Sequence, residues 1–261
     1  MTERAELEAD LRQALPENQL QLHFQPQVDE YGDAVGAEVL LRWIHPVRGV
    51  IPPGEFIALA EESELILDIG DWVLQRACAQ LAAWAESEVF RDLQLSVNVS
   101  PKQFRQADFV ERVRAAMRAE GVCPGRLKLE LTESLVVLDI DETVATMREI
   151  RKLGVGFSMD DFGTGHSSLT YLARLPLDQL KIDQSFVRNL PANRNDAVVV
   201  QTIIGMAASL SIEVIAEGVE TAAQRAFLEA NGCRRFQGHL YGVPAPIGEF
   251  ERRLRELFSA S

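Results

Sequence analysis

The sequence has few cysteines, few histidines and no long hydrophobic run. Its three cysteines, Cys78, Cys123 and Cys233, lie far apart without a CxxC spacing. This pattern predicts reduced thiols rather than a disulfide framework or a cysteine-bound metal. No apolar stretch approaches the roughly 18 residues that a membrane-spanning helix needs, and the polar start, MTER, does not resemble a secretion signal. We therefore expect a cytoplasmic protein with no membrane segment in this chain.

Positive charge is also scarce. The chain carries 26 Lys and Arg residues against 39 Asp and Glu residues, which gives a net charge of −13. An excess of acidic side chains argues against binding polymeric nucleic acid or an anionic membrane, since both need clustered basic residues. A small anionic substrate stays compatible with this composition if bound cations reverse the local charge.

The order of predicted elements indicates the fold class. No low-complexity tract or Gly/Ser linker divides the 261 residues, so we predict one domain over 1–261. Short apolar strand candidates alternate with amphipathic helices, as in strands that are covered on both faces. This alternation favours an α/β fold of the (βα)8-like TIM barrel type. The eight candidates are 20–28, 37–43, 93–100, 127–133, 156–160, 177–183, 212–217 and 236–241.

The first two strand candidates depart from a regular barrel. Only the short turn EYGD at 30–33 lies between them, which indicates a β-hairpin. We therefore predict one antiparallel strand near the start of the barrel. An open doubly wound sheet is the alternative, but no glycine fingerprint follows an early strand, as that fold would require for a dinucleotide.

Polar side chains occur in or just after the C-terminal halves of most strand candidates. Any one of them alone is well explained as a satisfied polar group at a strand end. Together, five or six carboxylates at one barrel mouth would repel one another unless cations hold them. The C-terminal mouth is also where catalytic groups of such barrels collect. The residues are Glu38, Asn98, Glu130, Glu133, Asp160, Asp161, Lys181, Asp183 and Glu217.

The residue types narrow the metal and the chemistry. Carboxylate and amide oxygens without a histidine pair or cysteine cluster favour Mg²⁺ or Mn²⁺ over Zn²⁺. Asp160 and Asp161 end a strand that turns into FGTG, so both can face the mouth, and one acid could bridge two ions. Two such ions are the usual clamp for attack of water on a phosphodiester. Lys181 would pair with the acids or orient the attacking water.

These residues belong to an ordered series of motifs that resembles the EAL-domain cyclic di-GMP phosphodiesterases over nearly the whole chain. The motifs are FQP at 24–26, EVLLRW at 38–43, NVS at 98–100, ELTES at 130–134, DDFGTG at 160–165, LKID at 180–183, AEGVE at 216–220 and QG at 237–238. Each motif is weak alone, but the ordered set is specific.

The resemblance implies hydrolysis of cyclic di-GMP to linear pGpG at a site with two divalent ions, Mg²⁺ or Mn²⁺. It assigns the first ion to Glu38, Asn98, Glu130 and Asp160, and the second to Asp160, Asp161 and Glu217. Glu217 would also act as general base, with Lys181 on the attacking water or the phosphate. The substrate side would be formed by Gln25, Arg42, Asp183 and Gln237. Glu133 would brace the loop after Asp161, which the family links to a homodimer interface.

Two departures and two alternatives accompany this interpretation. Val39 replaces the signature alanine on the strand face opposite Glu38, and His166 stands where the loop usually carries tyrosine.

A catalytically silent receptor of cyclic di-GMP is the main alternative function, although such family members lose metal ligands that this chain keeps. A barrel using Mg²⁺ and a lysine for enolisation is the second. Domains of this family often lie at the C-terminus of longer sensor or GGDEF-containing proteins. We therefore expect this chain to be either an excised domain or a stand-alone member.

Overall fold

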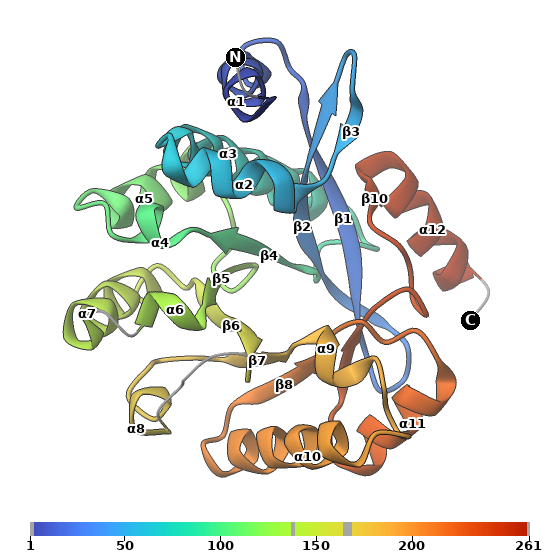
Figure 1. Ribbon diagram of the computed structural model, residues 1–261. Helices are drawn as coiled ribbons and strands as arrows, with labels where there is room; N and C mark the ends of the chain where they lie inside the picture. The colour runs from blue at the N-terminus through green and yellow to red at the C-terminus, as the bar shows by residue number, and fades with distance from the viewer. Residues whose placement is uncertain (1–2, 137–138, 164–168, 260–261) are drawn as a thin grey trace.

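The strands form a sheet that closes on itself (Figure 1). The computed structural model describes residues 3–136, 139–163 and 169–259. Its strands are β1 Leu20–Asp29, β2 Ala34–His45, β3 Gly49–Ile51, β4 Gln94–Val99, β5 Leu127–Thr132, β6 Gly156–Phe162, β7 Gln179–Ile182, β8 Glu213–Ala216, β9 Arg235–Gln237 and β10 Ala245–Pro246.

Helices surround this sheet on the outside (Figure 1). They are α1 Glu3–Ala14, α2 Pro53–Glu62, α3 Leu65–Ala85, α4 Pro101–Phe104, α5 Phe109–Glu120, α6 Glu133–Val136, α7 Ile140–Arg151, α8 Leu169–Leu172, α9 Gln184–Val187, α10 Arg194–Ser209, α11 Ala222–Ala230 and α12 Ile247–Ser259.

Eight strands make the closed barrel, which confirms the predicted fold class. From β2 through β4, β5, β6, β7 and β8 to β9 all neighbours are parallel, and β1 closes the ring between β9 and β2. β1 runs antiparallel to both of its neighbours. The predicted antiparallel strand near the start is therefore confirmed, and the open doubly wound sheet is wrong.

The turn between β1 and β2 has a local cause. The Asp29 carboxylate accepts hydrogen bonds from the backbone N–H groups of Tyr31 (2.9 Å) and Asp33 (3.0 Å). Gly32 in the same turn has a φ of +88°, which glycine adopts without steric cost. These contacts reverse the chain within a few residues and fix the register that places Gln25 opposite Glu38.

Helix starts are marked by capping side chains. Asp139 caps α7 and Asn193 caps α10 by accepting backbone hydrogen bonds. Thr221 and Gln224 form a reciprocal capping box at the start of α11. The apolar face of α3 packs against the barrel through residues at helical spacing, namely Val73, Ala77, Leu81 and Trp84.

The inside of the barrel is unusually polar. Along most barrel strands the apolar residues face the helices, and the alternating positions carry polar groups that are nevertheless buried. In most barrels of this kind branched apolar side chains fill the interior. Besides His45 at the end of β2, the buried polar residues on barrel strands are Gln25, Gln27, Glu38, Ser96, Lys128, Glu130, Ser158, Gln179, Lys181 and Gln237.

The last predicted strand was too long by a turn. The candidate 236–241 becomes β9, which ends at Gln237, after which Tyr241 N–H donates to the Gly238 carbonyl in a turn. The backbone at Gly238 passes so close to Val219 that a Cβ would lie 2.2 Å from its carbonyl oxygen. The strands β3 and β10 were not predicted, because two or three residues are too few to show an alternating pattern. None of the described helices is both long and apolar enough to span a bilayer.

The three cysteines should differ sharply in reactivity. Burial raises the pKa of both Cys78 and Cys233 to about 12, whereas Cys123 is exposed. We expect a thiol reagent at neutral pH to modify one thiol per folded chain, because the thiolate is the reactive form. After unfolding, all three should react. Rapid modification of two or more thiols in the folded protein would contradict this placement.

Candidate metal centre

A buried lysine lies at the centre of the site. The Lys181 Nζ atom lies 2.6 Å from Glu130 Oε2 and 2.6 Å from Glu217 Oε1. It also lies 3.0 Å from Asp160 Oδ1 and 3.3 Å from Glu38 Oε2. Lys181 is on β7, and its partners come from β2, β5, β6 and the residue that follows β8. The closed barrel therefore brings four carboxylates, far apart in sequence, to one ammonium group.

The excess of carboxylates changes their protonation. Burial raises the pKa of Glu130 to about 8 and raises that of Glu217 well above its ordinary value, even though Lys181 opposes both shifts. Burial also disfavours the charged form of Lys181, but Glu130 and Glu217 outweigh it and raise the lysine pKa. One ammonium does not neutralise four carboxylates, so this pocket favours additional positive charge.

Glu38 is held differently from the other acids. Asn98 Nδ2 donates to Glu38 Oε1 at 2.7 Å, and Gln237 Nε2 donates to Glu38 Oε2 at 2.6 Å. Burial alone would raise the pKa of Glu38, but the Lys181 charge and these two hydrogen bonds lower it below its ordinary value. Glu38 therefore keeps its charge in the pocket, with both oxygens oriented by neighbouring amides.

The Asp160–Asp161 pair depends on a local irregularity of β6. The pairing of β6 with β7 shifts between Met159 and Phe162, and Asp161 has a left-handed φ of +54°. A regular strand would direct adjacent side chains to opposite faces. Here carboxylate oxygens of both aspartates lie within 4.8 Å of one another and of Glu217. Burial, with Asp160 and Asp183 adding to it, raises the pKa of Asp161 to about 6.

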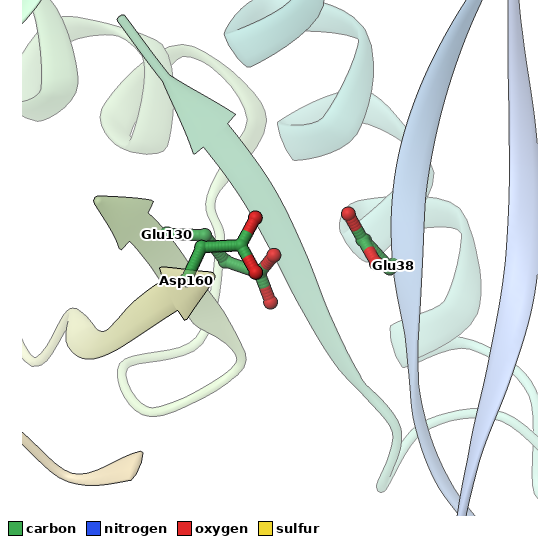
Figure 2. A group of neighbouring side chains, drawn as sticks. All are labelled: Glu38, Glu130 and Asp160. Atoms are coloured by element: carbon green, nitrogen blue, oxygen red, sulfur yellow. The ribbon is translucent and has the colours of Figure 1, made fainter. Parts of the chain in front are cut away.

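Two groups of oxygens could hold metal ions. Glu38, Glu130 and Asp160 form one group, and Asp160, Asp161 and Glu217 form the other, with the ligand atoms of each within 4.8 Å of one another. Figure 2 shows the carboxylates of Glu130 and Asp160 side by side, with Glu38 reaching toward them from β2. Asp160 belongs to both groups.

The donor set fits hard divalent cations. Both groups consist of carboxylates only, the ligand type that Mg²⁺ and Mn²⁺ prefer. Among the described residues, Glu130 Oε1 is buried without any hydrogen-bond partner. A buried carboxylate oxygen without a partner is costly, and a bound cation would remove that cost. The residues present therefore fit the metal that the family implies.

The predicted substrate residues are placed around this centre in different ways. Gln25 Oε1 accepts from Gln237 Nε2 at 3.0 Å, and Gln25 Nε2 donates to the Gly242 carbonyl at 3.1 Å. Asp183 caps α9 and accepts from the Ser185 N–H at 3.0 Å. The structure thus gives Gln25 and Asp183 local structural partners, and their contact with substrate stays a prediction.

Arg42 and Glu133 also lie near the mouth. Arg42 is half-buried and donates to the Leu41 carbonyl at 2.9 Å. Glu133 begins α6, is 7% exposed, and has no hydrogen-bond partner for either carboxylate oxygen among the described residues. The loop that it was predicted to brace includes His166 and residues 164–168, which lie outside the described part of the chain.

Two hollows meet at Leu40 and Asp160. Several predicted site residues line the polar one, whereas the sequence did not reveal its remaining walls or the second hollow. One, of about 230 Å³, is polar and includes Glu38, Lys181 and Glu217, with Gln184, Glu220 and His239 also lining it. The other, of about 310 Å³, is largely apolar and is lined by α2 and α3 through Ile57, Ile66, Ile69 and Val73. Helical periodicity identifies an inward face, but it does not distinguish a packed core from the wall of a hollow.

Comparison with known proteins decides the family. The model of the EAL domain matches residues 8–244. The chain belongs to the EAL domain family. It is 45% identical, over 94% of its length, to the bifunctional diguanylate cyclase/cyclic di-GMP phosphodiesterase MucR of Pseudomonas aeruginosa, and covers 36% of that protein. It is 43% identical over 97% of its length to the cyclic di-GMP phosphodiesterase NbdA of the same organism, covering 32% of it.

A solved structure supports the same assignment for this EAL domain. The PaMucR phosphodiesterase in complex with c-di-GMP superposes with a TM-score of 0.91 at 44% identity, over 94% of this chain and 99% of that one. The chain spans about a third of the length of the curated relatives it matches.

Removing the central lysine should destabilise the metal-free EAL domain. Lys181→Met leaves Glu38, Glu130, Asp160 and Glu217 without their shared cation, and breaking a buried ion pair typically costs about 3–5 kcal/mol. Differential scanning fluorimetry should show a lower Tm, which Mg²⁺ restores more strongly in the variant than in the wild type. The control is Lys152→Met, because Lys152 pairs with Glu149 on the surface. Equal Tm values for Lys181→Met and Lys152→Met would contradict the central role of Lys181.

Divalent metal affinity should rise with pH. Glu130 has a pKa near 8 in the metal-free domain, so below that pH a proton competes with the metal for the carboxylate. Calorimetric titration with Mg²⁺ should show affinity increasing from about pH 6 and levelling off above about pH 8, by up to about tenfold per pH unit. Affinity that does not change across this range would show that Glu130 does not bind the ion.

Proposed function

We propose that this EAL domain hydrolyses one phosphodiester bond of cyclic di-GMP to give linear pGpG, with two divalent ions, Mg²⁺ or Mn²⁺, in its barrel mouth. The observation that carries the proposal is the sharing of Asp160 by two carboxylate groups beside a buried lysine. The named activity of MucR and NbdA, together with the c-di-GMP complex of PaMucR, identifies the substrate.

The carboxylate geometry suggests which residues hold each ion. Glu38, Glu130 and Asp160 would bind the first, with Asn98 beside Glu38 as a fourth ligand. Asp160, Asp161 and Glu217 would bind the second. Bound divalent ions supply positive charge for the phosphate and lower the pKa of a coordinated water.

Three side chains of the site would take further roles in the hydrolysis. Glu217, whose pKa is raised by burial, is suited to accept the proton of the attacking water. Lys181 lies 2.6 Å from Glu217 and keeps its proton, so it can orient the water or neutralise the phosphate. Asp161, in its left-handed conformation at the end of β6, would help to position the reacting phosphate.

The two hollows match the phosphates and the purine bases of the substrate. The polar hollow contains the carboxylates and Lys181, where a phosphate would lie with its ions. The adjoining apolar hollow presents aliphatic side chains of α2 and α3, which suit the flat face of a purine base. Gln25, Arg42, Asp183 and Gln237 would contact the dinucleotide around these hollows. The acidic protein and the anionic substrate are compatible because the ions reverse the local charge.

Three further proposals concern the whole protein. We expect one domain over 1–261, a homodimer whose interface is linked to the site through Glu133, and a cytoplasmic location. The two relatives named above are about three times as long as this chain. If this chain is likewise part of a longer protein, the additional domains would provide the signal that regulates the site. Light scattering of the purified chain tests the dimer, and a mass that stays that of one chain at all concentrations would contradict it.

A timed chromatographic assay tests the activity. The purified protein is incubated with cyclic di-GMP and Mg²⁺, with Mn²⁺, or with a chelator. Metal-dependent formation of pGpG supports the proposal. Tight binding without product under all three conditions would contradict it and would indicate the silent receptor.

Glu38→Ala should abolish hydrolysis. The substitution removes a ligand of the first ion. Because a bound metal ion stabilises the charge of the transition state by several kcal/mol, we expect turnover to fall by at least roughly 100-fold. The matched control is Glu213→Ala, because Glu213 lies at the opposite end of β8 from Glu217 and pairs with Arg235. Circular dichroism checks that both variants fold. A folded Glu38→Ala variant with wild-type turnover would contradict the two-ion assignment.

A further inference from the structure

Gln27 lies in the barrel one layer below the metal centre. It is on β1, is 3% exposed, and pairs in register with Gly36 of β2 and Gln237 of β9. Gln25, two residues earlier on the same face, pairs with Glu38. Gln27 lines neither of the two hollows at the mouth. It lies just after the FQP motif at 24–26, and no role is predicted for it from the sequence.

A directed chain of amide hydrogen bonds connects Gln27 to the site. Gln27 Nε2 donates to Gln237 Oε1 at 3.0 Å. Gln237 Nε2 then donates both to Glu38 Oε2 at 2.6 Å and to Gln25 Oε1 at 3.0 Å. Gln25 Nε2 donates to the Gly242 carbonyl at 3.1 Å. Gln237 and Gln25 thus each use the side-chain oxygen to accept and the nitrogen to donate.

The direction of this chain is fixed at both ends. An ionised carboxylate and a backbone carbonyl can only accept hydrogen bonds, so Glu38 and Gly242 each require an N–H donor. Gln25 therefore turns its oxygen toward Gln237, and Gln237 turns its nitrogen toward Gln25 and Glu38. The Gln237 oxygen is left facing β1, where Gln27 provides the donor.

Gln27 is buried where β1, β2 and β9 meet. A Cβ at Gly36, its partner on β2, would lie 2.7 Å from the Gln94 carbonyl oxygen, so glycine there allows β2 and β4 to approach closely. The same Cβ would lie 3.4 Å from Gln27 Oε1, which is ordinary contact and shows that the Gln27 side chain lies against β2. Without the Gln27 donor, the Gln237 oxygen would be buried and unpaired, at a cost of about 1–3 kcal/mol, and rotation of its amide would direct an oxygen at Glu38.

We propose that Gln27 is a positioning residue of the metal centre, which acts by locking the Gln237 amide so that it holds Glu38 toward Glu130 and Asp160. The inference rests on the proposed function, in which Glu38 binds metal and its orientation therefore matters. Partners that orient a metal ligand typically change metal affinity or activity by about 10–100-fold when they are lost.

The test compares Gln27→Met, Gln237→Met and the double variant. The measured quantities are Mn²⁺ affinity of the substrate-free protein by calorimetry, Tm, and kcat and KM with cyclic di-GMP. We expect Gln27→Met to weaken Mn²⁺ binding by about tenfold. At limiting Mn²⁺, kcat should fall while KM stays close to that of the wild type, and additional Mn²⁺ should recover kcat. In the Gln237→Met background the same substitution should cause no further loss of affinity.

Val28→Ala is the matched control. Val28 is the next residue on β1, is 4% exposed and faces the helices, so its truncation should lower Tm without changing Mn²⁺ affinity. This control separates a loss of stability from a loss of orientation at the metal centre.

The outcomes distinguish the two proposals. If the wild type binds Mn²⁺ and hydrolyses cyclic di-GMP but Gln27→Met binds Mn²⁺ equally well, the positioning role is wrong and the proposed function stands. Losses that add in the double variant would show that Gln27 does not act through Gln237, which also overturns the inference. If the wild type binds no Mn²⁺, the proposed function fails, and the inference that rests on it fails with it.

Discussion

Four carboxylates around one buried ammonium are the constraint on which the rest of this structure depends. Collecting so many like charges in a protein interior is costly unless cations compensate. The parallel strands bring their C-terminal ends to one edge, so Glu130, Asp160, Lys181 and Glu217 meet there although they are far apart in sequence. The barrel interior beneath them is polar because each buried carboxylate and amide requires hydrogen-bond partners.

Lys181 would have two roles in the proposed reaction. Its ammonium contacts all four acids and offsets part of their charge. Bound ions would take over part of that compensation, and the same ammonium would then be available to the water or the phosphate. Glu38, by contrast, is oriented by two amides, those of Asn98 and Gln237.

Much of the fold was predictable because local chemistry and global topology agree. The apolar strands, the capped helices and the turn at residues 30–33 each carry a short-range signal, and together they gave the barrel and its antiparallel strand. The turn-like sequence after Asp161 also suggested that Asp160 and Asp161 face the same side, and the left-handed Asp161 provides the geometry. The end of β9 was not predictable, because it is set by the distant backbone of Val219 beside Gly238.

The parts of the site that escaped prediction depend on contacts between distant segments. The apolar hollow is built from helix positions that look like ordinary core in sequence, and the amide chain through Gln27 exists only once β1, β2 and β9 are paired.

The most direct test of this account is a crystal structure of the Mn²⁺-loaded protein with anomalous diffraction at the manganese edge. The account predicts two peaks, one among Glu38, Asn98, Glu130 and Asp160 and one among Asp160, Asp161 and Glu217. A map with no anomalous peak between these carboxylates, and with Lys181 still in contact with all four acids, would contradict it.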